Sequence, residues 1–103
     1  MSKIQVYRTL DEYYPFYLCE HTNRTCRLLH FAGTTIGLAL LITALLTQVW
    51  WLLGVGLVLT YAIAWAGHYF FEHNKPAAFK HPWLSTLSDL RMCWQMLTGK
   101  IPF

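Results

Sequence analysis

Two long apolar runs separated by a short polar turn dominate the middle of the chain. The runs cover residues 31–46 and 49–66, and no Lys, Arg, Asp or Glu occurs between Arg27 and Glu72. Each run, with its flanks, is long enough for a helix of about 20 residues, the length that crosses the hydrocarbon core of a bilayer. The polar pair Thr47-Gln48 marks a turn between the runs, so the pattern predicts a helical hairpin.

The polar ends of the chain predict shorter helices. Thr9 and Glu12 are spaced as in a capping box, and an aromatic-rich helix is expected to follow them to about Glu20. Asn23 has the residue type and position of an N-cap for the first long helix. Leu and Trp recur at three- and four-residue steps within residues 83–97, which indicates an amphipathic helix. We expect both end helices to lie at the membrane interface.

The predicted fold is all-α: a membrane hairpin of two transmembrane helices flanked by amphipathic interfacial helices, in one domain, residues 1–103. The spanning segments are expected at about 30–47 and 50–71, and the second helix is expected to continue to about Asn74, before Pro76. The composition agrees, because only 13% of the residues are charged, against about a quarter in soluble domains. The alternative is a buried hairpin in a soluble bundle, but so short a chain has little polar sequence to cover it.

The distribution of charge predicts the orientation of the hairpin. The formal net charge is +3, and all eight Lys and Arg residues lie in the two ends of the chain, outside the apolar runs. Cytoplasmic segments are enriched in Lys and Arg, so both termini are expected on the cytoplasmic side and the turn on the opposite side. The basic residues are spread along the ends rather than clustered, so the charge does not indicate a nucleic-acid partner.

Histidines stand where the apolar runs meet their polar flanks. His30 and His68 lie at nearly equal sequence distances from the turn, so at a rise of about 1.5 Å per residue their depths differ by only ~1.5 Å. Glu72 follows His68 at i+4 and would share its helix face. His21 precedes the first long helix and would fold back over the same region. The sequence therefore predicts one cluster of imidazoles at one membrane surface.

Such a cluster indicates a metal site with His21, His30, His68 and Glu72 as ligands. Imidazoles with one carboxylate and an open position suit iron(II), and zinc accepts the same ligands. Glu72 is expected either to bind the metal or to orient one of the histidines. No role is assigned to His73, His81 or Asp89. The cysteines form no C-x-x-C motif, and we expect each to serve packing: Cys19, Cys26 and Cys93.

Three sequence segments at these positions are similar to the motifs of one protein family. Residues 17–23 (YLCEHTN) and 27–34 (RLLHFAGT) resemble its N-terminal motif, and residues 65–77 (WAGHYFFEHNKPA) resemble its second motif. This family of small membrane proteins contains the fungal endoplasmic-reticulum dioxygenase that shortens 2-hydroxy fatty acids during phytosphingosine breakdown. The resemblance extends over nearly the whole chain, since residues 82–103 look like the C-terminal tail of bacterial members.

The resemblance implies an iron(II)-dependent, O₂-consuming α-oxidation, in which a long-chain 2-hydroxy fatty acid loses its carboxyl carbon. By this similarity His21, His30 and His68 match the family's histidines and Glu72 its acidic position. The expected catalytic residues are Glu72 and Arg27, with Arg27 (or Arg24, close to it) holding the substrate carboxylate. The expected partners are the fatty acid, O₂ and membrane lipid, with the chain in a bacterial inner membrane. A homodimer is a further expectation.

Two other functions fit the same residues. His30 and His68 on antiparallel helices are also the arrangement expected of the axial ligands of a haem in an electron-transfer membrane protein. A non-catalytic membrane adaptor would use the histidines only for structure. A Soret band in the purified protein would indicate the first, and the absence of any copurified metal would indicate the second.

Overall fold

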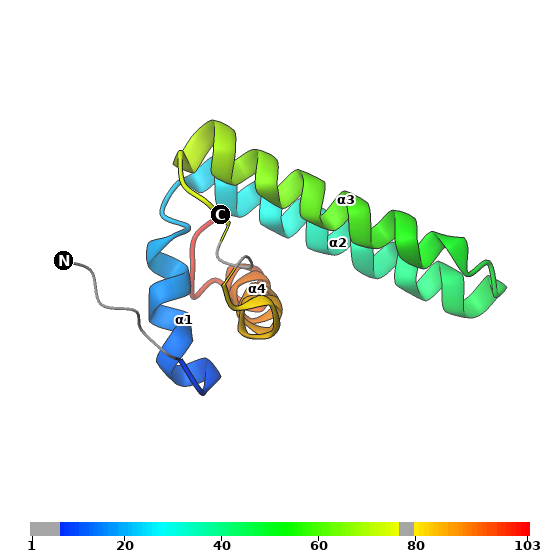
Figure 1. Cartoon of the computed structure of the whole chain (residues 1–103), viewed down its shortest axis with the longest axis horizontal. Helices are drawn as coiled ribbons and strands as arrows, with labels where there is room; N and C mark the ends of the chain where they lie inside the picture. The colour runs from blue at the N-terminus through cyan, green and yellow to red at the C-terminus, as the bar shows by residue number, and fades with distance from the viewer. Residues whose placement is uncertain (1–6, 77–79) are drawn as a thin grey trace.

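The computed structural model describes residues 7–76 and 80–103, and within these ranges every regular element is helical (Figure 1). The prediction of an all-α fold is confirmed. Two long apolar helices pack along each other as a hairpin, and two shorter helices lie at its open end. In chain order the elements are α1 (Leu10–Cys19), α2 (Arg24–Thr47), α3 (Trp51–Gly67), the π-helical turn η1 (His68–Glu72) and α4 (Pro82–Leu97).

The predicted ends of α2 are present. The Asn23 side chain accepts a hydrogen bond from the backbone N–H of Cys26 at 3.1 Å, as an N-cap does. Gln48 ends the helix in the left-handed conformation, with φ of 59°, and its N–H donates to the carbonyl of Ala44 at 2.8 Å. The chain then reverses into α3, so the turn lies where the polar pair of residues predicted it.

Small residues allow α2 and α3 to approach closely. The Thr60 hydroxyl on α3 lies 3.0 Å from the carbonyl oxygen of Gly33 on α2 and 2.8 Å from that of Gly56 on its own helix. A Cβ atom at Gly33 would lie 3.1 Å from the Thr60 carbonyl oxygen, and one at Gly37 would overlap the Thr60 hydroxyl. The interface is therefore of the small-residue type that is common between membrane helices.

Gly37→Ala is expected to destabilise the hairpin by about 1–3 kcal/mol, because its new methyl group would displace the Thr60 hydroxyl or separate the helices. Gly54→Ala is the matched control. It makes the same change in α3 at a position with nothing within 4 Å, so it should gain the helix propensity of alanine, about 0.5–1 kcal/mol. Unfolding of both variants by denaturant in detergent micelles measures the difference. Equal stability of the two would contradict close packing at Gly37.

The outer surface of the hairpin is apolar and exposed. α2 and the continuous helical segment Trp51–Glu72 are each long and apolar enough to cross a membrane by length and composition. Large side chains along them are exposed, among them Leu46 at 80% and Val58 at 67%. Exposed apolar patches of this extent are rare in soluble monomers and mark surfaces that meet another apolar phase.

Helices α1 and α4 pack against each other beside the open end of the hairpin, and α4 runs across the direction of α2 and α3 (Figure 1). Their shared core contains Tyr13, Met92 and Met96, all at most 1% exposed. The Tyr13 hydroxyl lies 2.8 Å from that of Ser85, and Tyr14 donates to Gln95 at 2.6 Å. These contacts hold α4 against α1.

The predicted capping box at α1 is half present. Thr9 accepts a hydrogen bond from the N–H of Glu12 at 3.2 Å, as an N-cap should. The Glu12 carboxylate, however, accepts from the N–H of Arg8 at 3.2 Å rather than from that of Thr9. Thr9 is therefore the N-cap of α1, as predicted, but the reciprocal bond from its own N–H to Glu12 is replaced by the bond from Arg8.

The second long helix differs from the prediction at its end. It was expected to continue as an α-helix to about Asn74, but α3 ends at Gly67 and a π-helical turn, η1, follows. The N–H groups of His73 and Asn74 both donate to the carbonyl of His68, and His73 ends the turn with φ of 61°. A π turn is wider than an α turn and occurs mostly at functional sites. Here it changes which side chains share the face of His68.

Candidate metal centre

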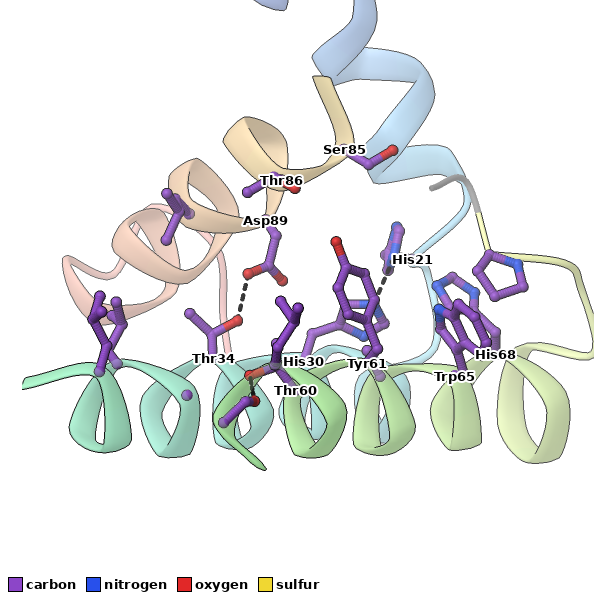
Figure 2. A pocket seen from close by; sticks show the side chains of 18 of the residues that line it. His21, His30, Thr34, Thr60, Tyr61, Trp65, His68, Ser85, Thr86 and Asp89 are labelled. Atoms are coloured by element: carbon purple, nitrogen blue, oxygen red, sulfur yellow. Dashed lines mark hydrogen bonds between the residues drawn. The ribbon is translucent and has the colours of Figure 1, made fainter. Parts of the chain in front are cut away.

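Three histidines from separate parts of the chain meet in the interior. His21 comes from the bend between α1 and α2, His30 from α2, and His68 from the first position of η1. Their exposed fractions are 1%, 5% and 2%. The ring centroids lie 4.4 Å (His21–His30), 4.5 Å (His21–His68) and 4.9 Å (His30–His68) apart. Figure 2 shows the three rings grouped at one end of a pocket.

Each of these imidazoles has its Nδ1 atom beside an oxygen that can only accept a hydrogen bond. His21 Nδ1 lies 2.6 Å from the carbonyl oxygen of Tyr17, and His30 Nδ1 lies 2.9 Å from that of Cys26. His68 Nδ1 lies 2.7 Å from Oδ1 of Asn74. All three Nδ1 atoms must therefore carry the proton, which leaves Nε2 of each neutral ring with a free lone pair.

The orientation of the Asn74 amide is fixed from its other side. Its Nδ2 donates to the carbonyl of Glu20 at 3.1 Å and to the carboxylate of the same residue at 2.8 Å. Both of these atoms are acceptors, so the amide nitrogen must face Glu20 and the amide oxygen must face His68. Glu20 and Asn74 thus form a chain of hydrogen bonds that determines which nitrogen of His68 is free.

The free Nε2 lone pairs of His21 and His30 face each other. Nε2 of His21 and Nε2 of His30 are 3.1 Å apart, a close contact between two electron pairs unless a cation or a proton lies between them. Two nitrogens that each lie about 2.1 Å from one ion, at a right angle, are about 3 Å apart. Burial and the neighbouring imidazoles of His30 and His68 lower the pKa of His21 to about 2, so this ring stays neutral. The donor set fits a divalent transition metal.

The fourth member of the cluster is a cysteine for which the sequence predicts only a packing role. Cys26 is fully buried, and the four potential ligand atoms of His21, Cys26, His30 and His68 all lie within 4.8 Å of one another. Its Sγ atom lies 3.7 Å from His30 Nδ1, the protonated nitrogen. A Cβ atom at Gly67 would lie 3.1 Å from Sγ. The spacing of Cys26 and His30, i and i+4 on one helix, was the signal that could have indicated this proximity.

Glu72 is the last residue of η1; its carboxylate reaches the start of α2 and is not in the group of possible ligands around the histidines. Its carboxylate accepts hydrogen bonds from the backbone N–H of Asn23 and, at 3.4 Å, from the hydroxyl of Thr22. A carboxylate at this position satisfies a free N–H of the helix and interacts favourably with the helix dipole. The π turn carries Glu72 there, so i+4 spacing does not place it beside the ring of His68.

Arg27 also contacts the bend that carries His21. Its guanidinium donates to the carbonyl oxygens of His21 at 3.2 Å and Thr22 at 2.9 Å. Arg27 is not among the residues that line the pocket. Arg27 and Glu72 therefore each bind backbone or side-chain groups of the α1–α2 bend and hold it in position.

Glu72→Gln is expected to bind iron(II) with at most about a fivefold loss of affinity relative to the wild type. Glutamine retains a side-chain oxygen for the N–H of Asn23, while loss of the charge removes a helix-dipole interaction of about 0.3–1 kcal/mol. Iron content per chain, measured after anaerobic loading and gel filtration, checks this. Loss of iron comparable to that of a histidine variant would instead identify Glu72 as a ligand.

A pocket of about 480 Å³ extends from the histidines along the hairpin. It is polar at the histidine end and apolar toward the turn, with α4 forming one wall (Figure 2). The polar end comprises Tyr17, His21, His30, Thr34, His68 and Asp89. The apolar end comprises Leu38, Leu41, Leu53 and Leu57, all of which are also exposed on the surface of the hairpin. The pocket is thus an apolar groove that has the three histidines, the possible metal ligands, at one end.

The remaining histidines lie elsewhere. His73 is exposed after η1. His81 precedes α4 and contacts the aromatic rings of Tyr7 and Tyr13, at centroid distances of 5.5 Å and 5.1 Å. Neither lines the pocket.

A model of a known protein family matches the part of the chain that contains these histidines. No curated protein and no solved structure matches the chain. A family model described as 2-hydroxy-palmitic acid dioxygenase Mpo1-like matches residues 7–101. This match includes all three histidines, the π turn and the pocket. The chain therefore belongs to the Mpo1-like family of dioxygenases.

Proposed function

We propose that the protein is an iron(II)-dependent dioxygenase that shortens long-chain 2-hydroxy fatty acids by one carbon. The observation that carries the proposal is a cluster of three buried imidazoles at one end of an apolar groove, with potential ligand atoms within 4.8 Å of one another. The description of the family supplies the reaction class. The donor set is His21, His30 and His68, which replaces the predicted set that included Glu72.

Residues of the chain itself hold the imidazole rings in their orientations. Hydrogen bonds from Nδ1 to Tyr17, Cys26 and Asn74 fix the ring orientations, which is the usual role of groups behind metal ligands. Iron(II) held by three neutral imidazoles would supply the activation of O₂ and leave positions for the substrate carboxylate and 2-hydroxyl. Burial of the rings excludes bulk water from this end of the pocket.

The groove accounts for a substrate with a long apolar chain. From His30 to Leu41 it follows α2 for about 16 Å, and its apolar walls would cover the acyl chain while the polar head reaches the histidines. We place the hairpin across a membrane, with both termini on the cytoplasmic side, because its outer surface is apolar and all Lys and Arg residues lie at the ends. The acyl chain would then enter the groove directly from the lipid.

Anaerobic purification with metal analysis, followed by incubation with 2-hydroxypalmitate and O₂, tests the proposal. The expected result is iron bound at one ion per chain and formation of the C15 fatty acid. Omission of O₂, or removal of iron by a chelator, should each abolish the product. Unchanged 2-hydroxypalmitate in the presence of bound iron and O₂ would remove this activity from the protein.

The haem alternative is disfavoured by the packing of the rings. A porphyrin held by His30 and His68 would have to lie between them, but their centroids are 4.9 Å apart and His21 contacts both. The purified protein is accordingly expected to show no Soret band.

A further inference from the structure

Asp89 is a half-buried acid in the wall of the groove. It lies on α4 and lines the pocket opposite α2, close to the polar end (Figure 2). The hydroxyl of Thr34 on α2 donates a hydrogen bond to one of its carboxylate oxygens, and the Tyr17 side chain also interacts with the carboxylate and favours its ionised form. Within the part of the chain that the structure describes, no Lys or Arg forms an ion pair with it. Burial raises the pKa of Asp89 to about 6.

Removing the Asp89 carboxylate from water costs free energy, and a role that only joins α4 to α2 does not explain this cost. A carboxylate without a cationic partner loses hydration on burial, and such groups persist mostly where they have a task. A serine or an asparagine at the same position would join α4 to Thr34 without burying a charge. The two side chains occupy only part of the carboxylate, which offers about four lone-pair sites. The remaining sites are available to a molecule in the groove.

Tyr17 relates Asp89 to the metal centre. Its ring stacks on that of His21, with centroids 4.0 Å apart, and its side chain also interacts with the carboxylate of Asp89. The carboxylate therefore lies about one phenol ring away from the histidines. A fatty acid whose head is at the histidines and whose chain runs toward Leu38 must pass Asp89 with its first carbons.

We propose that Asp89 is a substrate-positioning residue that accepts a hydrogen bond from the 2-hydroxyl of the fatty acid. The inference rests on the proposed function and adds the residue that selects hydroxylated over plain fatty acids. A carboxylate has no proton to donate, so it attracts a hydroxyl and repels a second carboxylate. It would thus bind the 2-hydroxyl and direct the substrate carboxylate away from α4, toward the histidines.

The test is a competition between two ligands at the metal-loaded protein without O₂, so that no turnover occurs. 2-Hydroxypalmitate and palmitate are compared in the same detergent micelles for every variant, so that any difference in their partition into the micelle is the same for each protein. The wild type should prefer 2-hydroxypalmitate. Asp89→Leu should lower that preference by about tenfold or more, the range for a hydrogen bond to a charged group, with palmitate affinity changed by less than about threefold.

Asp89→Asn provides the conservative variant. Its amide oxygen can still accept from the 2-hydroxyl, so its preference should fall between those of the wild type and Asp89→Leu. Iron content and helix content, measured by circular dichroism, should be equal in all three proteins. An equal loss of affinity for both acids, or an unchanged preference in Asp89→Leu, would show that Asp89 only joins α4 to α2 and would overturn the inference.

The same binding assay separates this inference from the proposed function. A wild type that prefers 2-hydroxypalmitate but forms no C15 acid with O₂ would refute the dioxygenase activity. The binding preferences of the Asp89 variants would still test the role of Asp89 in selectivity. A wild type that turns over substrate but binds both acids equally would refute the role of Asp89 alone.

Discussion

His68→Ala is expected to abolish stoichiometric iron binding and to reduce formation of the C15 acid by more than about 100-fold. The substitution removes one of three clustered imidazoles and leaves the other two, His21 and His30, without the third donor. Loss of groups that merely support a ligand already costs about 10–100-fold, so loss of the ligand itself should cost more. His30→Ala should behave in the same way.

His73→Asn is the control for a general effect of losing a histidine in this segment. His73 is exposed and adopts the left-handed conformation, which asparagine tolerates well. This variant should bind one iron per chain and keep its activity within about twofold. Metal content by mass spectrometry and product formation by chromatography distinguish the two variants. A His68→Ala protein with full iron content would show that the three-histidine centre is not the iron site.

Asn74→Ala is expected to weaken iron binding by about 10–100-fold without loss of the fold. The side chain of Asn74 makes no contact with the other two histidines in the hydrogen-bond network; it acts by accepting from Nδ1 of His68 at 2.7 Å while Glu20 holds its amide group. Without this acceptor, His68 is free to carry its proton on Nε2, and the lone pair then faces away from the cluster.

A titration of the metal-free protein with iron(II) under anaerobic conditions measures the effect. Asn23→Ala is a matched comparison, since it removes an asparagine from the other side of the same junction, where the side chain caps α2. That variant should lose about 0.5–2 kcal/mol of stability and keep nearly wild-type affinity for iron. Equal iron affinities of Asn74→Ala and the wild type would contradict the role of Asn74 in fixing the tautomer.

The parts of the fold that depend on local physics could be predicted from the sequence. The absence of charge between Arg27 and Glu72 indicated the hairpin, and Asn23 and Gln48 marked the ends of α2. The proximity of His30 and His68 needed only the constant rise of an α-helix and a turn of known position. These inferences hold because each depends on neighbours in the sequence or on a single antiparallel pairing.

The parts that depend on irregular backbone could not be predicted in the same way. The extension of an α-helix to Asn74 placed Glu72 on the face of His68, whereas the π turn directs it to Asn23 and brings Asn74 to His68. The periodicity of the apolar residues contains no signal for a single π turn. The contact of Asp89 with Thr34 joins residues 55 positions apart, and no local pattern indicates which side of the hairpin α4 covers.

X-ray absorption spectroscopy of the iron(II)-loaded protein tests the central claim most directly, because it counts the ligands of the metal by type. With His21, His30 and His68 as the donors, the spectrum should show three imidazole nitrogens per iron, with oxygen ligands alone completing the shell, and His68→Ala should lose the site. A shell with fewer than three imidazoles, or one that contains the Cys26 thiolate, would contradict the arrangement of lone pairs described above.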